Sequence, residues 1–143
     1  MIRTAAAGDL DGLMALYAHL HDTRQASRDE TGAVWRQIMA DPNHQIVVAQ
    51  EEAGIVSSCV CLIVPNLTHD QRPYALIENV VTHPHWRKRG LATACLAFAA
   101  SLAKQRNCYK IMLMTGAKDA ETLRFYQRAG FNAQDKTAFI RWL

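Results

Sequence analysis

The chain has 143 residues, of which half are hydrophobic and a fifth are charged, and its formal net charge is +3 at pH 7. This length suits one compact domain, residues 1–143, and this composition excludes a disordered chain. The longest stretch with few charges, residues 91–103, is shorter than the roughly 20 residues of a membrane-spanning helix. The N-terminus lacks the apolar core of a secretory signal, so we expect a cytoplasmic protein without a membrane partner.

Two helices are predicted in the N-terminal third. Apolar residues recur at helical spacing over 10–20, and Asp9 can cap the start of this helix. Ser27 begins a capping box, and the helix that follows must stop before Pro42. The segment between the two helices, residues 22–26, is predicted to be a polar loop.

The central part of the chain predicts strands. Residues 45–50 and 55–64 are rich in β-branched side chains and are separated by a short turn, which is typical of an antiparallel hairpin. Residues 74–82 form a largely apolar strand that only Glu78 interrupts with a charge, and a short strand is expected around residues 2–3. These strands predict one sheet on which the helices pack.

The C-terminal part adds a parallel crossover unit. Gly90 precedes a predicted helix over residues 91–107, and residues 109–115 form the next strand. A strand, a helix and a second strand in this order form a right-handed parallel unit. A last helix over 120–129 and two closing strands within 131–142 complete a predicted α/β fold.

The stretch RKRGLA, residues 87–92, lies where a buried strand meets a helix. Free backbone N–H groups and the helix dipole favour an anion there, and Gly90 permits a phosphate to approach the main chain closely. A solvated basic loop is the alternative. Nucleic acid is not expected as a partner, because the helix over 91–103 is almost uncharged and the net charge is small.

Two motifs resemble those of the GCN5-related N-acetyltransferases. Arg87, Gly90 and Ala92 stand at the defining positions of that family's cofactor motif, R/Q-x-x-G-x-G/A, and LRFYQRAGF at 123–131 is similar to its second hallmark. Weaker agreement reaches the N-terminus. The resemblance implies a mixed, twisted sheet of about six to seven strands flanked by about four helices, with acetyl-CoA as cosubstrate and no metal.

The resemblance also implies which residues hold acetyl-CoA. Main-chain groups of residues 80–82 would pair with the pantetheine arm, and amides of residues 88–93 would hold the pyrophosphate. Asp119 stands where many members have an asparagine, and a carboxylate cannot donate that hydrogen bond. The implied cofactor-binding residues are Val80, Val81, Thr82, Arg87, Lys88, Arg89, Gly90, Leu91, Ala92, Thr93, Asp119 and Phe125.

Glu78 is the candidate general base. An alkyl ammonium has a pKa of about 10.4, so the acceptor amine needs help to lose its proton at neutral pH. Glu78 is the one carboxylate in a mostly apolar strand beside the implied thioester site, and we expect burial to raise its pKa. The alternative is a structural carboxylate that pairs with an arginine such as Arg72, or one that binds the substrate ammonium.

Tyr126 is the candidate general acid. It occupies the position at which the family places the group that protonates the departing thiolate. Its neighbour Phe125 should face the core. The alternative for Tyr126 is a packed aromatic side chain with a satisfied hydroxyl. A backbone N–H near Val81 would polarise the carbonyl oxygen of the thioester.

The remaining cysteine and histidine residues do not predict a metal site. His83 and His85, like His19 and His21, are two residues apart without a third ligand nearby in the sequence. The four cysteines form no CxxC pair, so we expect reduced and mostly buried thiols.

The acceptor amine is left open by the sequence. The stretches IENVV and NCYKIML resemble the glucosamine-6-phosphate N-acetyltransferase branch, which makes an amino sugar phosphate one candidate among small-molecule acceptors. A polyamine, an amino acid or a protein amine are others. An inactive CoA-binding sensor or interaction module of the same fold is the alternative function, and the closing segment 136–143 could support a homodimer.

Overall fold

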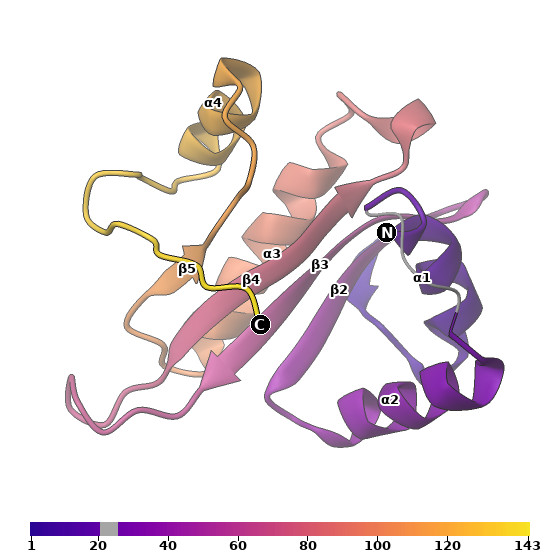
Figure 1. The fold of residues 1–143 in the computed structure, drawn as a ribbon, viewed down its shortest axis with the longest axis horizontal. Coiled ribbons are helices and arrows are strands. Elements are labelled where there is room, and N and C mark those ends of the chain that lie inside the picture. Colours follow the sequence, from indigo (N-terminus) through magenta and orange to yellow (C-terminus); the bar gives the residue numbers. More distant parts are fainter. Residues whose placement is uncertain (21–25) are drawn as a thin grey trace.

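A five-stranded mixed sheet forms the centre of the computed structural model, which describes residues 1–20 and 26–143 (Figure 1). The strands lie in the order β1-β2-β3-β4-β5, and β4 and β5 are parallel while the other neighbours are antiparallel. Most of the predicted loop at 22–26 lies outside the described residues. The strands are β1 Ile2–Thr4, β2 His44–Glu51, β3 Gly54–Val64, β4 Tyr74–Thr82 and β5 Ile111–Leu113.

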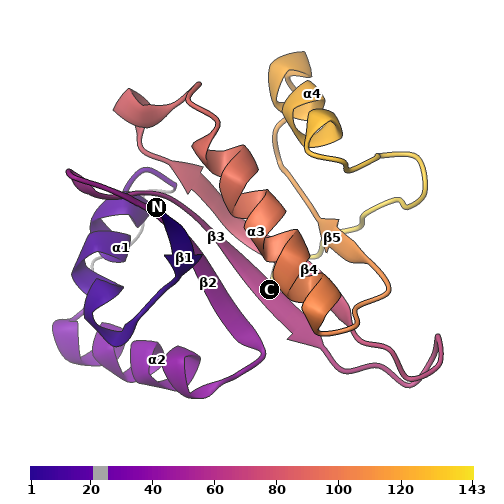
Figure 2. The same ribbon diagram turned by 180° about the vertical axis from the view of Figure 1, so that it is seen from behind.

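Four α-helices flank the sheet within the described residues, which agrees with the predicted number. They are α1 Leu10–Tyr17, α2 Arg28–Ala40, α3 Leu91–Gln105 and α4 Ala120–Arg128, with 3-10 turns η1 Ala7–Asp9 and η2 Pro84–Trp86. Figures 1 and 2 show α3 on one face of the sheet, α1 and α2 on the other, and α4 beyond the β5 edge. No helix among the described residues has the length and apolar character needed to cross a membrane.

The two faces of the sheet carry separate apolar cores because side chains alternate along each strand. On β2, Val47 and Ala49 pack with α3, whereas Ile46 and Val48 pack with α1 and α2. The small residue Ala99 is fully buried on α3, and the Cys61 Sγ lies 4.0 Å from its carbonyl oxygen. Small residues on α3 therefore allow this helix to pack closely on the sheet.

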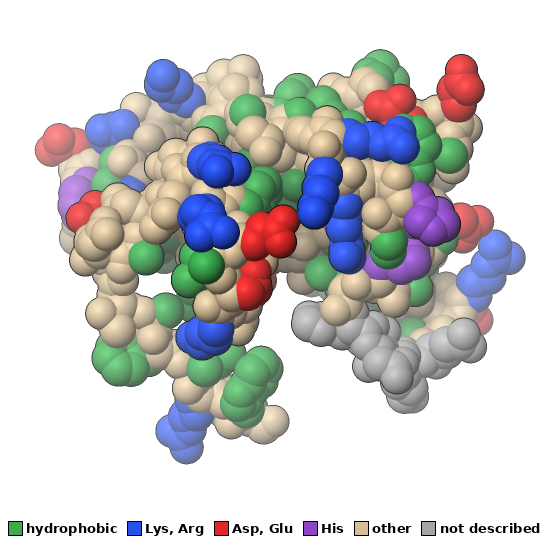
Figure 3. Space-filling view, turned by 90° about the horizontal axis from the view of Figure 1, so that it is seen from above, with side chains coloured by type: hydrophobic (Ala, Val, Ile, Leu, Met, Phe, Trp, Pro, Cys, Tyr) green, Lys and Arg blue, Asp and Glu red, His purple; other side chains and the backbone are tan. Residues whose placement is uncertain are grey.

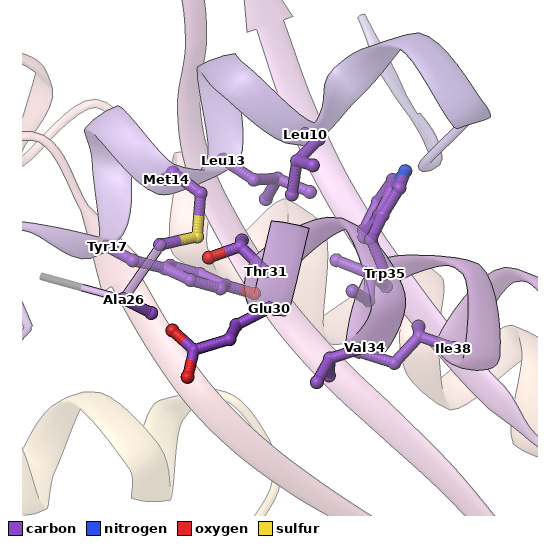
Figure 4. Close-up of a pocket in the computed structure, with 11 residues that line it drawn as sticks. Leu10, Leu13, Met14, Tyr17, Ala26, Glu30, Thr31, Val34, Trp35 and Ile38 are labelled. Carbon is purple, nitrogen blue, oxygen red and sulfur yellow. The ribbon is translucent and has the colours of Figure 1, made fainter. Parts of the chain in front are cut away.

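An apolar pocket of about 350 Å³ lies between α1 and α2 (Figure 4). Side chains from both helices line it, and the Trp35 Nε1 ties α2 to the start of the chain by donating to the Ala7 carbonyl at 2.9 Å. The Ser27 capping box is confirmed, since its Oγ accepts from the Glu30 N–H at 3.1 Å.

The predicted cap of the first helix is wrong. Asp9 makes no capping bond to α1 and instead accepts two bonds from the Arg3 guanidinium, at 2.6 and 2.9 Å, and one from the Ala6 N–H. A charged partner makes a stronger hydrogen bond than a helix-terminal amide, so the carboxylate turns towards Arg3. The helix also ends at Tyr17, and residues 18–20 continue as tighter turns.

The two closing strands predicted within residues 131–142 are also wrong. The structure forms no strand after β5, so five strands replace the expected six to seven among the described residues, and β5 itself is shorter than the predicted 109–115. The apolar pattern correctly marks residues suited to a strand, but a strand also needs a paired neighbour. Here Phe139 is 90% exposed and Trp142 is 85% exposed.

Candidate functional site

The parallel strands β4 and β5 pair over only three positions and then separate. Ala75 to Ile77 pair with Ile111 to Leu113, after which β4 continues to Thr82 without β5 beside it. A register shift against β3 places a bulge at Asn79, whose φ is 51°. Because a bulge bends its strand and increases the twist, it accompanies the divergence of the two strands. The β5-facing edge of β4 thereby offers unpaired main-chain groups.

The turn that enters α3 presents backbone amides in an unusual conformation. Lys88 has a φ of 60° and Gly90, the N-cap of α3, has a φ of 76°. Left-handed residues of this kind orient neighbouring N–H groups into an anion-binding nest, and the positive end of α3 adds to it. A Cβ built on Gly90 would meet no atom within 4 Å, so the space over the turn is open. The residues present therefore fit a phosphate-bearing ligand.

A cleft of about 1060 Å³ is lined by the end of β4, this turn, the start of α3 and α4. Figure 3, which looks onto this end of the molecule, shows Lys and Arg side chains in two groups with acidic side chains between them. Of the predicted site residues, the following line the cleft: Val80, Val81, Thr82, Arg87, Lys88, Gly90, Leu91, Ala92, Thr93, Phe125 and Tyr126. Val80 and Tyr126, which are 46 positions apart in the sequence, thus line the same cleft.

Tyr126 lies in the α4 wall of the cleft between two other aromatic rings. Its ring centroid is 4.9 Å from that of Phe125 and 6.5 Å from that of Phe131. Burial raises the pKa of the Tyr126 phenol, and the nearby Cys59 raises it further. The hydroxyl is therefore protonated at neutral pH, as a proton donor must be. Phe125 packs against the α3-side core, as expected.

Glu78 differs from its predicted environment. It lies on β4 opposite Val60, but its side chain is exposed, so the expectation of a buried carboxylate is wrong. Alternation along β4 places Glu78 on the same face as Leu76, away from α3. Glu78 is not among the residues that line the cleft, although Val80, two positions along, is.

The suggested partner of Glu78 is engaged elsewhere. Arg72 donates to the carbonyls of Asn107 and Cys108, both at 3.2 Å, and thereby ties the loop before β4 to the loop before β5. No ion pair of Glu78 occurs in the described part of the chain. The structural alternative based on Arg72 is thus contradicted, and the general-base role stays a prediction.

Two further predicted cofactor residues lie outside the cleft lining. The Arg89 guanidinium stacks on the Trp86 ring, 4.6 Å from its centroid. Asp119 caps α4, because its carboxylate accepts from the Thr122 N–H at 2.8 Å, and this bond lowers the pKa of Asp119. The cap explains why an aspartate suits this position, since Asp is among the preferred N-cap residues.

Several cleft residues were not predicted from the sequence. Trp86, His19 and Leu20 line the cleft from η2 and the end of α1, and α4 contributes Glu121, Thr122, Arg124 and Arg128. The Lys88 Nζ lies 3.7 Å from the Glu121 carboxylate, across the cleft, with both side chains largely exposed. Arg124 and Arg128 are four residues apart on a predicted helix, so the sequence indicated that they share one helix face. No feature of the sequence indicated that His19 would reach the cleft.

The cysteine side chains are inert at neutral pH. Cys59, Cys61 and Cys95 are fully buried, and burial raises the pKa of each thiol, to about 11 for both Cys61 and Cys95. A buried thiol of this kind behaves as a small apolar side chain. Within residues 1–20 and 26–143, no group of three His, Cys, Asp or Glu side chains is arranged to hold a metal ion.

Comparisons with known proteins agree with this geometry. The model of the acetyltransferase (GNAT) family matches residues 13–131. The chain is 27% identical over 136 residues to the glucosamine 6-phosphate N-acetyltransferase of Trypanosoma brucei brucei, covering 94% of this chain and 90% of the relative. It is 43% identical to a solved protein of Agrobacterium tumefaciens str. C58 described as an acetyltransferase, with a TM-score of 0.92 and 99% of each chain covered.

A third comparison concerns the fold alone. The structure of glucosamine-6-phosphate N-acetyltransferase from Arabidopsis thaliana is 22% identical and superposes with a TM-score of 0.87, covering 99% of this chain and 97% of that one. The family match spans both the cofactor turn and the wall that carries Tyr126. The chain therefore belongs to the GNAT family of acetyltransferases.

Proposed function

We propose that this protein moves the acetyl group of acetyl-CoA to a primary amine by direct attack in a ternary complex. The observation that carries the proposal is the cleft between α4 and the part of β4 that no longer pairs with β5, since this cleft reaches the nest of Lys88 and Gly90. A pantetheine arm needs main-chain partners along its length, and a pyrophosphate needs converging N–H groups. This cleft offers main-chain groups of both kinds.

The residues fit the cosubstrate as follows. Amides of residues 88–93 would hold the pyrophosphate with support from the Arg87 side chain, and the free edge of residues 80–82 would pair with the pantetheine arm. Bound acetyl-CoA supplies the thioester carbonyl that the amine attacks. A backbone N–H of this strand near Val81 would polarise that carbonyl. Asp119 and Arg89 contribute through the α4 cap and the Trp86 stack.

Proton transfer is assigned to Glu78 and Tyr126. Deprotonating an alkyl ammonium at pH 7 costs about 4 to 5 kcal/mol, because its pKa is near 10.4. Glu78 would accept that proton from the face of β4 opposite α3, directly or through water, and its exposure keeps it accessible to a polar acceptor. The protonated Tyr126 hydroxyl would donate to the departing thiolate.

The acceptor is proposed to be a small amine, with an amino sugar phosphate as the first candidate. The trypanosomal relative carries that activity in its name, and cations from the turn before α3 and from α4 line the cleft. Polyamines, amino acids and protein amines are the competing acceptors. We expect the protein to act in the cytoplasm, where acetyl-CoA is supplied.

Calorimetric titration with acetyl-CoA tests the first step. Micromolar binding is expected, and the absence of heat at millimolar cosubstrate would contradict the proposal. A thiol-release assay then compares glucosamine 6-phosphate, glucosamine, a polyamine, amino acids and a lysine peptide. Binding of acetyl-CoA without thiol release from any amine would instead favour a CoA-binding sensor or interaction module.

A further inference from the structure

Three histidine side chains gather at one mouth of the cleft. His19 lies in the turn after α1 and lines the cleft, and His83 and His85 lie directly after β4. The ring centroids of His19 and His83 are 4.6 Å apart and those of His83 and His85 are 5.2 Å apart, both edge to face. Figure 3 shows His side chains next to a group of Lys and Arg side chains on this end of the molecule. The three imidazoles thus come from chain segments more than 60 residues apart.

The charges around this histidine cluster, defined as His19, His83 and His85, have one sign. Arg87 adjoins it, and the Arg87 Nε donates to the Thr82 carbonyl at 3.3 Å, which holds the guanidinium beside the cluster. Within the described residues no carboxylate forms an ion pair with these imidazoles or with Arg87. Burial lowers the pKa of His83, and His19, His85 and Arg87 lower it further. The groups that act on His83 are thus two imidazoles and one guanidinium, so an anion is the complementary ligand.

The hydrogen bonds of His83 orient its free nitrogen. Its Nδ1 accepts from the His85 N–H at 3.3 Å, so a neutral His83 carries its proton on Nε2 and can donate from there. An anion with several acceptor oxygens matches several N–H groups at once. A phosphate group has three acceptor oxygens and a charge of about −1.5 to −2 at pH 7. It therefore provides both the acceptors for several N–H groups and the negative charge that complements the cluster.

We propose that His19, His83 and His85, with Arg87, form a phosphate-binding site at the mouth of the cleft, and that binding is accompanied by proton uptake. The phosphate belongs either to the cosubstrate or to the acceptor, since both chemistries enter this cleft. The inference rests on the proposed function for the identity of these ligands. It shares Arg87 with the proposed pyrophosphate site of residues 88–93 and adds imidazole side chains from two other segments.

Histidine ring NMR tests the site on the unmodified protein. The pKa of each imidazole is measured in the free protein and with CoA, dephospho-CoA, glucosamine 6-phosphate, glucosamine and inorganic phosphate. An opposite charge nearby favours the protonated form, so a bound phosphate should raise the pKa of His83 by about one unit. Unchanged imidazole pKa values with every phosphorylated ligand, under conditions where binding is measured independently, would overturn the proposal.

The ligand series identifies the source of the phosphate. If the imidazole pKa values rise with CoA but not with dephospho-CoA, the bound group is the cosubstrate's 3′-phosphate; if they rise with both, it is the pyrophosphate. If they rise with glucosamine 6-phosphate but not with glucosamine, the bound group is the phosphate of the acceptor. Each of these outcomes supports the site, and none depends on acetyl transfer, so a failed activity assay would count against the proposed function alone.

Substitutions provide the second measurement. His83→Asn and His19→Asn should weaken binding of the phosphorylated ligand about five- to tenfold at pH 6, and less at pH 8, where the imidazoles stay neutral. His44→Asn, at the start of β2 and outside the cluster, is the matched control. Equal affinities for His83→Asn and the control at both pH values, with melting temperatures unchanged, would overturn the inference while leaving catalysis intact.

Discussion

Gly90 combines a backbone conformation that favours glycine with open space in which a ligand could contact the backbone amides. Its φ of 76° is a conformation that side chains with a Cβ adopt rarely, and the space over it is open. Any side chain there would both strain the turn and occupy the place of a ligand that contacts the amides. The neighbouring cations act at longer range, since the Lys88 side chain is largely exposed and pairs with Glu121.

Gly90→Val should abolish binding of acetyl-CoA in calorimetric titration. Gly54→Val is the matched control, because Gly54 also has a positive φ, of 105°, with open space around it, but is the first residue of β3, directly after the β2–β3 turn. Both variants should lose a similar amount of stability, whereas the control should still bind. Lys88→Ala should weaken binding by only about 1 kcal/mol, as for an exposed charge. Wild-type affinity in Gly90→Val would refute the nest.

Tyr126→Phe should lower kcat about 10²-fold while the Kd for acetyl-CoA stays unchanged, because the ring packing survives and only the donated proton is lost. Steady-state kinetics and calorimetry separate the two quantities. Tyr109→Phe serves as the control, since Tyr109 stacks on His69 outside the cleft. If Tyr126→Phe changed the affinity for acetyl-CoA and left kcat intact, its role would be packing.

Glu78→Gln should also lower kcat about 10²-fold at pH 7 if Glu78 accepts the amine proton. Part of the loss should be recovered at higher pH, where more of the acceptor is already neutral. The rate is measured by thiol release between pH 6.5 and 9.5 at saturating substrates. Glu52→Gln, in the β2–β3 turn, should match wild type. An unchanged kcat and pH profile in Glu78→Gln would remove the base role.

At the scale of elements, the pairing of Arg3 with Asp9 fastens β1 to the turn before α1. The Arg3 guanidinium also donates to the Gln50 side chain at 2.7 Å, which joins β1 to the end of β2. The hydrogen bonds from Arg3 lower the pKa of Asp9 below its usual value, with a smaller contribution from the Ala6 N–H. This carboxylate is 15% exposed, so water screens the pair only weakly.

Asp9→Asn should destabilise the protein by about 1–2 kcal/mol at neutral pH, because a hydrogen bond to a charged group is lost. The folded-state pKa of Asp9 lies below the unfolded value of about 3.9, so its contribution is complete above that pH and disappears as pH falls through the lowered pKa. Denaturant unfolding of both proteins from pH 7 to pH 2.5 should show the difference shrinking on acidification.

Asp11→Asn is the control for this experiment. Asp11 is 82% exposed and lies 3.4 Å from the Arg28 guanidinium, an arrangement that contributes little to stability. Its substitution should change the unfolding free energy by less than about 0.5 kcal/mol at either pH. A pH-independent difference for Asp9→Asn would show that packing, and not the charge on Asp9, is what the substitution disturbs.

At the scale of the whole molecule, the C-terminal segment exposes large apolar side chains to solvent. The tail, residues 136–143, contains large apolar side chains that are mostly exposed: Phe139, Ile140, Trp142 and Leu143. The sheet also has an outer strand in β5 whose second edge pairs with no described strand. Apolar surface of this kind favours association.

Deleting residues 136–143 should convert a dimer of the full chain into a monomer, measured by light scattering after size exclusion. The circular dichroism of the fold should persist, because the tail buries little in the isolated domain. Leu67→Ser, which alters an apolar side chain that is 87% exposed in the β3–β4 loop, should leave the mass unchanged. A monomeric full-length chain would contradict the predicted homodimer.

Local patterns were enough to predict most of the fold. The hairpin, the β4 strand, the Ser27 capping box and the α3 start at Gly90 all depend on neighbours within a few residues, and the structure agrees with each. The turn that is proposed to bind the pyrophosphate is also a local feature, because its glycine and the helix start are adjacent in the chain. The cap at Asp9 was predicted wrongly because its actual partner, Arg3, lies on another element.

The amino-acid sequence by itself determined the four helices, the strands β1 to β5 and their order, and the residues that β4 and the turn before α3 bring to the cleft. Only the tertiary structure decided that β4 and β5 separate after Ile77, that Glu78 is exposed, and that His19 meets His83 beside Arg87. The physical reason is the distance along the chain over which each effect acts. Periodicity, caps and turns depend on residues a few positions apart, whereas the burial of a side chain and its contacts with distant residues depend on how distant strands pair and diverge. The same reason explains why the tail has a strand-like pattern but no strand.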